Sequence, residues 1–448
     1  MLIDRAIDDG IDTIVTCDNG IAATEEIAYG KEKGLTVIVT DHHEVPYVEM
    51  NGEKEYLLPK ADAVVDPHRP DCGYPFKGLC GAAVAYKLVE ALYNVMQKDP
   101  EDMDYLMENV AIATVGDVMD LTGENRIFVK QGLEMLKRTK NQGLKALIEC
   151  TGIDVERLNT YHIGFVLGPC INASGRLDTA KRALELLNVR ARRDAVMLAE
   201  DLKVLNDSRK EMTERGVAEA VHMIETTSLK DDKVLVVYLP DCHESIAGII
   251  AGRIKERYYR PVFVLTKAEG GVKGSGRSIE AYDMFSQMCR CRALFTKFGG
   301  HKMAAGLSLE EENVRRFRDT INALCDLTEQ DMQMKVSIDM QLPFSYITEE
   351  LVEELELLEP FGKGNQKPLF AEKNLRVLSP RIIGKNRNVL KCCLEDVNGN
   401  QMEGVYFGDV DSCLRAMETK PVMSFTYYPS VNEYMGRRSL QVTIVNYQ

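Results

Sequence analysis

The chain has 448 residues, of which 45% are hydrophobic, and a formal net charge of -14 at pH 7. This length and apolar content exclude a disordered polypeptide, and the apolar stretches are far too short to cross a bilayer, so we expect a soluble cytoplasmic protein of about two to three domains. The 12 cysteines include no C-x-x-C pair, which argues against structural zinc and favours reduced thiols.

The first predicted elements form a β-α-β unit. Strand-like residues run from Ile11 to Thr16 and from Leu35 to Thr40, and the stretch "TEEIAYGKEKG" between them has helical character and ends in glycine. The two strands should therefore be parallel, which places Asp18 and Asp41 at the same edge of the sheet, where open α/β sheets bind ligands. For Asp18 alone, a role as the N-cap of the next helix is an equally good interpretation.

Two adjacent histidines, His42 and His43, follow Asp41 directly, although the chain has only 7 histidines. Imidazoles bind divalent metals and are readily oriented by a nearby carboxylate. Together with Asp18 at the neighbouring strand end, this pattern predicts a metal site of mixed nitrogen and oxygen ligands. Such a ligand set suits Mn²⁺ or a similar ion better than structural zinc.

A long helix over residues 190–227 is predicted to lead into a second domain, because this range contains no proline and has apolar residues at helical spacing. The second domain begins with the strand "KVLVVYL", continues with a helix and reaches the strand "RPVFVL", so it is again α/β. The glycine-rich stretch "GGVKGSGRS" that follows is interpreted either as an ordinary hairpin or as an anion-binding loop in which Arg277 grips phosphate.

Beyond about Met334 short strands and turns predominate, as at the Asn398-Gly399 turn. The negative net charge hides two basic segments: 11 Lys and Arg stand against 4 Asp and Glu from Arg253 to Lys302, and 8 stand against 1 from Pro360 to Lys391. Such segments are typical of solvated surfaces, but they also allow a polyanion to bind.

Seven stretches, taken together, resemble the DHH phosphoesterase superfamily and, within it, the RecJ family of single-strand-specific DNA exonucleases. They occur in the order typical of that family and extend over nearly the whole chain. The stretches are "TDHHEVP", "DPHRPDCGYPFKGLCGAAVAYKL", "ATVGDVMDL", "GFVLGPCINASGRLDTA", "HESIAGIIAGRIKERYYRPVFVL", "GSGRS" and "KFGGHKMAAG". A further stretch, "EPFGKGNQKPLF", resembles the start of the family's OB-like module.

The resemblance implies an α/β protein with a parallel-sheet DHH domain over residues 1–189, incomplete at its N-terminus, and a linking helix over 190–227. A smaller α/β DHHA1 domain over 228–330 and a β-rich OB-like single-strand-binding domain over 331–448 would follow. In the OB-like module, basic residues would form a DNA groove, and aromatic residues would be stacking platforms or, taken singly, barrel core. The basic candidates are Lys363, Lys367, Arg381, Lys385, Arg387 and Lys391, and the aromatic ones are Phe361, Phe370 and Tyr406.

The resemblance also implies roles for individual residues. Asp18 would bridge two divalent cations, Mn²⁺ or Mg²⁺, and His42 and Asp117 would be ligands of one of them. Asp41 would act on the residues that surround the metal rather than bind the metal itself, and His43 would face the scissile phosphate. Both would be catalytic residues. Without the resemblance, Asp117 is better interpreted as a helix-terminal acid. The implied substrate-binding residues are Asn172, Arg176, Ser275, Arg277, Ser278, Gly299, Gly300 and His301.

The function implied is a metal-dependent exonuclease that digests single-stranded DNA from 5′ to 3′ in recombination and repair. Its partners would be single-stranded DNA, a helicase and a single-strand-binding protein. Association with a membrane is not expected. Two alternatives are a DHH-DHHA1 phosphodiesterase for short oligonucleotides, which the OB-like module disfavours, and a catalytically inactive single-strand-binding scaffold.

The family also has an earlier Asp-x-Asp-Gly motif that supplies further carboxylates to the metals. In this chain Asp8-Asp9-Gly10 leads straight into the strand before Asp18, so we do not assign it that role. The chain therefore resembles a family member that lacks its N-terminal segment. We expect this polypeptide to bind metal poorly and to cut DNA slowly or not at all.

Overall fold

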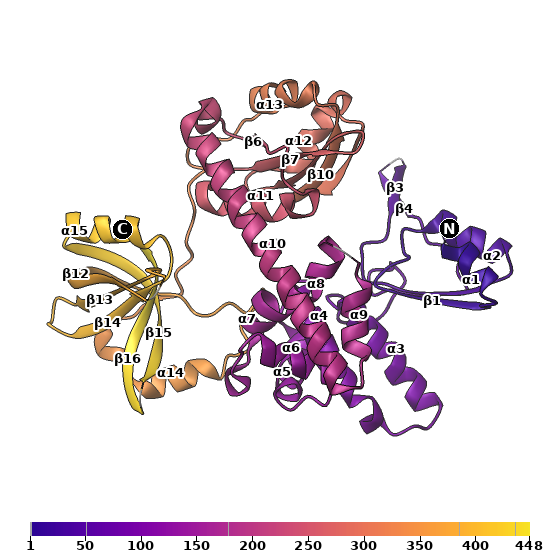
Figure 1. Cartoon of the computed structure of the whole chain (residues 1–448), viewed down its shortest axis with the longest axis horizontal. Coiled ribbons are helices and arrows are strands. Elements are labelled where there is room, and N and C mark those ends of the chain that lie inside the picture. Colours follow the sequence, from indigo (N-terminus) through magenta and orange to yellow (C-terminus); the bar gives the residue numbers. More distant parts are fainter. Residues whose placement is uncertain (1, 51, 178, 385, 435) are drawn as a thin grey trace. The chain divides into compact units, whose positions relative to one another are not determined.

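The computed structural model describes residues 2–448 apart from 51, 178, 385 and 435. The chain forms two compact units, whose helices and strands are labelled in Figure 1. The first unit comprises Met1–Thr139, Val155–Gly164 and Val336–Gln448, and the second comprises Lys140–Asp154 and Phe165–Lys335. The predicted fold class, α/β with a β-rich C-terminal module, is confirmed.

The first unit begins with a parallel three-stranded sheet. Its strands are β1 (Thr13–Cys17), β2 (Thr36–Thr40) and β5 (Ala63–Val65), in the order β1-β2-β5, and α2 (Thr24–Glu32) connects the first two. This confirms the predicted β-α-β unit. Cys17 pairs with Thr40, so the next residues, Asp18 and Asp41, leave neighbouring strands at the same edge. The core under the sheet contains Ile27, Leu35, Val37 and Val39, with α1 (Leu2–Asp8) packed alongside.

Helices complete this part of the first unit. The core residues Leu79, Ala83, Val110 and Phe128 pack together helices α3 (Gly81–Val95), α4 (Met107–Gly116) and α5 (Gly123–Lys137). Helix α4 ends at Gly116, so that Asp117 follows immediately at its C-terminus. The hairpin of β3 (Tyr47–Met50) and β4 (Glu53–Tyr56) is exposed along both strands. The short helix α7 (Thr160–His162) also belongs to this part.

The second unit is built around the long helix α10 (Arg192–Thr226), within the range for which a helix was predicted. Three shorter helices, α6 (Gln142–Cys150), α8 (Gly168–Leu177) and α9 (Lys181–Asn188), contact α10. Along the described chain, no helix combines the length and apolar character that spanning a bilayer requires.

A five-stranded mixed sheet follows α10, in the order β6-β7-β8-β10-β9. Strands β6 and β7 are parallel and the others are antiparallel. The strands are β6 (Leu235–Tyr238), β7 (Val262–Ala268), β8 (Gly271–Arg277), β9 (Lys297–His301) and β10 (Ala304–Leu309), and the helices are α11 (Ala247–Tyr258), α12 (Met284–Arg290) and α13 (Asn313–Ala323).

Of the two interpretations of the glycine-rich stretch, the structure shows the hairpin, because residues Gly271–Arg277 form the central strand β8, which pairs antiparallel with β7. Its glycines make room for core side chains: a Cβ on Gly274 would lie 2.3 Å from Leu265, and one on Gly276 would lie 2.4 Å from Met284. Gly274 and Gly276 are therefore needed because neighbouring side chains pack against the strand.

The C-terminal module of the first unit is a closed barrel. Its strands pair in the ring β12-β13-β14-β16-β15, and β15 pairs back to β12. The predicted Asn398-Gly399 turn joins β13 to β14, with Gly399 at φ +83°. The elements are β11 (Met340–Gln341), α14 (Glu349–Glu356), β12 (Phe370–Ile383), β13 (Val389–Glu395), β14 (Gln401–Tyr406), α15 (Val410–Thr419), β15 (Val422–Tyr434) and β16 (Arg437–Tyr447).

Candidate metal centre

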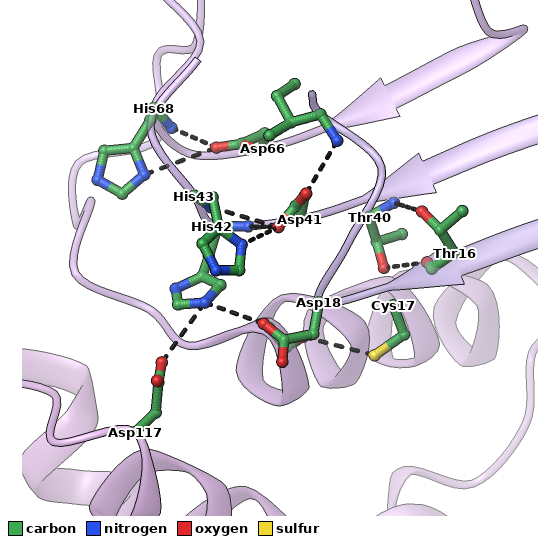
Figure 2. A network of polar contacts seen from close by, with 12 residues as sticks. Thr16, Cys17, Asp18, Thr40, Asp41, His42, His43, Asp66, His68 and Asp117 are labelled. Carbon is green, nitrogen blue, oxygen red and sulfur yellow. Dashed lines mark hydrogen bonds and ion pairs between the residues drawn. The ribbon is translucent and has the colours of Figure 1, made fainter. Parts of the chain in front are cut away.

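Three side chains from separate elements meet at the carboxyl edge of the parallel sheet. The Nε2 atom of His42 lies 3.0 Å from Oδ1 of Asp18 and 3.4 Å from Oδ2 of Asp117 (Figure 2). Asp18 follows β1, His42 follows β2, and Asp117 follows α4. The donor atoms of Asp18 and His42 are close enough to bind one divalent cation, because ligand oxygen and nitrogen atoms lie about 2.0–2.2 Å from the ion, and Asp117 adjoins them on the other side of His42.

His43 also belongs to this group. Among the described side chains, the ligand atoms of Asp18, His42 and His43 all lie within 4.8 Å of one another. The mixture of carboxylate and imidazole donors suits Mn²⁺ or a similar cation. The residues present therefore fit the metal that the sequence predicts.

The backbone near two of these acids is strained. Asp18 has a φ of +63°, and Val118, directly after Asp117, has a φ of +56°. For a β-branched residue such as valine this left-handed conformation is unfavourable and persists only where the surroundings enforce it. The missing side chain of Gly81 makes room for Asp18 in this conformation, because a Cβ at position 81 would lie 2.5 Å from the Asp18 side chain.

Asp41 lies behind the histidines and holds them. Its carboxylate is 1% exposed, and it accepts hydrogen bonds from the amides of Ile21 (2.9 Å) and His42 (2.8 Å) and from Nδ1 of His43 (2.7 Å). Burial raises the pKa of the Asp41 carboxyl, but these hydrogen bonds outweigh burial and bring the pKa below its usual value. The hydrogen bond to Asp41 in turn raises the pKa of His43.

The acids around His42 place negative charge close together. Burial raises the pKa of the Asp117 carboxyl, the charge of His42 opposes this effect, and the charge of Asp18 adds to it. A cation bound between the carboxylates would relieve this repulsion, since an opposite charge within a few ångströms favours the ionised form.

Two features of this region were not predicted. Asp66 is buried beside the Asp41 group (Figure 2), and its Oδ1 accepts a hydrogen bond of 2.7 Å from the His68 amide, whereas its Oδ2 has no partner among the described residues. Lys363 of the C-terminal module lies 3.1 Å from Asp120, close enough to Asp117 for its charge to lower the pKa of that carboxyl. No local pattern predicts this contact, because the partners are remote in sequence.

Several of the residues predicted to bind substrate in the second unit lie on strands β8 and β9, on either side of β10. Ser275 pairs across β10 through Gly306 to Gly299, and Arg277 pairs through Ala304 to His301, so these rows lie on one face of the sheet. A pocket of about 450 Å³ is lined by Ser275, Gly299, Lys273 and Lys297. A Cβ on Gly248 would lie 2.9 Å from Nη2 of Arg277, so this glycine of α11 allows the guanidinium its place.

Three of these predictions need correction or qualification. Ser278 is 1% exposed and donates its hydroxyl to the Tyr282 carbonyl (2.6 Å), so it stabilises the fold and is not available to DNA. Gly299, Gly300 and His301 lie in strand β9, where they pair with β10. Asn172 is exposed on α8, and the side chain of Arg176 lies outside the described part of the structure.

Some of the basic and aromatic candidates of the barrel also have structural roles. Phe370 is 6% exposed and belongs to the barrel core, and Lys391 pairs with Glu403 at 2.7 Å. Lys367 lies over the rings of Phe361 and Tyr428, with Nζ at 6.0 and 5.3 Å from their centroids. Lys385 lies outside the described residues.

Comparison with known families and proteins agrees with this organisation. The model of the DHH family, N-terminal domain, matches residues 2–114, that of the DHHA1 domain matches 231–326, and that of the RecJ OB domain matches 338–446. The single-stranded-DNA-specific exonuclease RecJ of Bacillus subtilis is 36% identical over 97% of the chain, and that of Salmonella typhimurium is 35% identical over 99%. The chain spans about half (54%) of the Bacillus relative and 78% of the Salmonella relative.

Solved structures give the same result. RecJ from Thermus thermophilus in complex with Mn²⁺ superimposes with a TM-score of 0.81 at 27% identity, and the match covers the whole of this chain and 63% of that one. A second structure, an exonuclease RecJ bound to manganese, has a TM-score of 0.59 at 30% identity over 72% of this chain and 78% of its own.

Proposed function

The chain belongs to the RecJ family, and from this premise we propose that it is a divalent-metal-dependent exonuclease that hydrolyses phosphodiester bonds in single-stranded DNA. The observation that carries the proposal is the convergence of Asp18, His42 and Asp117 at one sheet edge. These are the positions at which the sequence resembles the family's metal-binding motifs.

Asp18, His42 and Asp117 hold the metal, Mn²⁺ or Mg²⁺, in this proposal. Relatives whose structures contain Mn²⁺ support the choice of ion. When bound, the metal supplies a Lewis acid that activates water and stabilises charge on the phosphate. In the complete family site, Asp18 would bridge this ion to a second one.

The chain's own residues orient the reaction. Asp41, fixed by the amides of Ile21 and His42, holds the His43 ring by its Nδ1 atom. This leaves the other edge of the ring to face the scissile phosphate and donate a hydrogen bond to the oxygen on which charge develops. Asp41 therefore serves as a positioning residue, and His43 as the residue that contacts substrate.

DNA binding is proposed for the mixed sheet of the second unit and for the barrel. Ser275, Arg277, Gly299 and His301 share one face, where a backbone phosphate can accept hydrogen bonds from a guanidinium fork. The barrel carries basic residues and has the OB fold, which binds single strands in basic grooves with stacked bases.

The finer biology follows from the family resemblance. We propose digestion from 5′ to 3′ in recombination and repair, in the cytoplasm, together with a helicase and a single-strand-binding protein. These assignments rest on family membership and not on a contact in the structure.

The experiment that tests the proposal uses the full chain with Mn²⁺ and end-labelled DNA. Single strands should be shortened from the 5′ end, duplexes of the same sequence should resist, and Asp18→Ala should abolish cleavage. A length series separates the alternatives: preference for very short oligonucleotides would favour the phosphodiesterase, and tight binding without cleavage would favour the scaffold. A wild-type rate unaffected by chelation of the metal would refute the proposal.

A further inference from the structure

A short segment of the C-terminal module docks against the part of the chain that carries Asp117. This segment, Leu357–Asn365, lies between α14 and β12, and we call it the brace. The Leu121 amide donates to the Lys363 carbonyl at 2.7 Å, and Nζ of Lys363 lies 3.1 Å from Oδ1 of Asp120. Brace and metal-site residues belong to the same compact unit.

Side chains of the helical part fasten the brace at two more points. Nη2 of Arg126, on α5, donates to the carbonyls of Leu358 (2.9 Å) and Glu359 (3.1 Å). The hydroxyl of Thr160 donates to the Phe361 carbonyl at 2.6 Å. These backbone carbonyls of the brace would otherwise need water as a hydrogen-bond donor. Here the donors are side chains of the helical part of the same unit.

The brace is also shaped by its own hydrogen bonds. Nδ2 of Asn365 donates to the carbonyls of Leu358 (2.8 Å) and Pro360 (2.9 Å). The backbones of Gly362 and Asn365 bond to each other in both directions, at 2.9 and 3.2 Å. A segment held in this way can act as a fixed surface for the chain that packs on it.

The segment that the brace contacts requires such support. Helix α4 ends at Gly116, and the chain then turns sharply through Val118 at φ +56°. This conformation costs on the order of 1–3 kcal/mol for a non-glycine residue and persists only where the surroundings fix it. The direction of the Asp117 carboxylate depends on this turn, because Asp117 is the residue at which the helix stops.

Two glycines set how closely the brace approaches. A Cβ on Gly362 would lie 2.6 Å from Cδ1 of Leu121, and a Cβ on Gly364 would lie 3.0 Å from Cβ and 3.3 Å from Cα of Asp120. An alanine at Gly362 would therefore displace the buried Leu121 side chain, which lies four residues after Asp117 and against the brace.

We propose that the brace is a positioning element of the metal centre: it fixes the turn after α4 and thereby holds Asp117 in place to bind the metal. The inference rests on the proposed metal site and extends it to the C-terminal module, whose assigned role is DNA binding. Docking of the backbone supplies the effect. The ion pair of Lys363 and Asp120 contributes little, because both side chains are more than half exposed.

The test measures binding of Mn²⁺ alone to the full-length chain by titration calorimetry. Gly362→Ala should weaken Mn²⁺ binding by about tenfold or more, which is the usual effect of losing a group that orients a ligand. Arg126→Met should have a similar effect from the opposite side of the contact. Lys363→Met should change the affinity by no more than about twofold.

The matched control is Gly399→Ala. Gly399 also belongs to the C-terminal module; its φ is positive, unlike that of Gly362, but a Cβ there would meet no atom within 4 Å. This variant should bind Mn²⁺ as the wild type does. Hydrogen exchange of the Leu121 amide in metal-free protein should accelerate in Gly362→Ala and Arg126→Met and remain unchanged in the control.

A positioning role also predicts that excess Mn²⁺ restores turnover in Gly362→Ala, with an unchanged KM for DNA. Wild-type Mn²⁺ affinity in both Gly362→Ala and Arg126→Met, despite faster exchange at Leu121, would overturn the inference. A wild-type chain that binds no Mn²⁺ would overturn the metal site itself, and the inference with it.

Discussion

Nδ1 of His43 lies 2.7 Å from Oδ1 of Asp41, whereas Nε2 of the adjacent His42 is directed at Asp18 and Asp117. Two neighbouring rings, with centroids 4.5 Å apart, thus have different partners. One ring belongs to the group of metal ligands, and the other is held by a buried carboxylate. This difference should be visible when each histidine is replaced separately.

His42→Ala should remove most of the Mn²⁺ affinity, because the imidazole lies between two carboxylates that would otherwise repel each other. His43→Ala should leave Mn²⁺ affinity within about twofold of the wild type, but lower kcat by about 10²–10³-fold, the usual cost of a donor to developing charge. Calorimetry and steady-state kinetics check both. Equal loss of Mn²⁺ binding in the two variants would contradict the division of roles.

Gly81→Ala should weaken the metal centre without unfolding the chain. The added Cβ would lie 2.5 Å from the Asp18 carboxylate oxygen and 2.7 Å from its Cα, so Asp18 must move. Alanine is otherwise well tolerated at the first residue of helix α3. Mn²⁺ titration is the measurement, and Gly73→Ala, where a Cβ meets nothing within 4 Å, is the control. Identical affinities would show that Asp18 is not a ligand.

The metal stoichiometry should be one Mn²⁺ per chain. Among the described side chains, only one group of three potential metal-ligating residues lies within 4.8 Å of one another; of its members Asp18 and His42 are the proposed ligands, together with the adjoining Asp117. A second ion would share Asp18 and lack further ligands from these motifs, so turnover should be slow. Two tight sites by calorimetry, or rapid Mn²⁺-dependent cleavage, would contradict this expectation.

Arg277→Met should raise the KM for single-stranded DNA and leave Mn²⁺ affinity unchanged, because Arg277 lies on the mixed sheet and not at the metal site. Loss of one phosphate contact should reduce the slope of log affinity against log salt by about 0.7 for a single strand. Arg316→Met, on the exposed side of α13, is the control. A salt slope equal to that of the wild type would exclude Arg277 from the DNA interface.

The barrel should become less stable as the pH rises from about 5 to 8. Glu372 is 7% exposed, and burial raises its pKa to about 7, above the 4.5 of an unfolded chain. The folded state therefore favours the protonated carboxyl: stability is fully present below about pH 4.5 and is lost as the pH rises through about 7.

Glu372→Gln should remove this loss and stabilise the barrel by about 1–3 kcal/mol at pH 8, but hardly at pH 4.5. The amide oxygen can still accept the hydrogen bond from the Phe344 amide. Calorimetric unfolding of wild type and variant at both pH values measures the effect. The same stability difference at the two pH values would show that Glu372 does not titrate on folding.

Much of the fold was predictable because it depends on local patterns. The alternation and helical spacing between Ile11 and Thr40 indicate a β-α-β unit, and the parallel pairing of its strands brings Asp18 and Asp41 to one edge. The Asn398-Gly399 turn was predictable for the same reason. In each case the residues that determine the structure lie within a few positions of the element that they form.

The glycine-rich stretch before Ser278 shows the limit of local patterns. Its composition fits either a hairpin or an anion-binding loop, and the structure shows a hairpin strand in which Leu265 of β7 and Met284 of α12 occupy the space beside its glycines. A glycine pattern reports that something approaches closely, whereas the tertiary structure decides whether an anion or a core side chain does so.

By itself the sequence determined the elements, the acids at the strand ends, and, through the resemblance of ordered motifs, the family. The resemblance placed Asp117 with His42 as ligands of one metal, but only the tertiary structure showed their contact and docked the brace beside Leu121. The physical reason is that strands and helices follow from the periodicity of neighbouring residues. Contacts between remote segments depend instead on complementary shape and on backbone hydrogen bonds. Backbone groups are present in any sequence, so a local pattern does not predict which of them will meet.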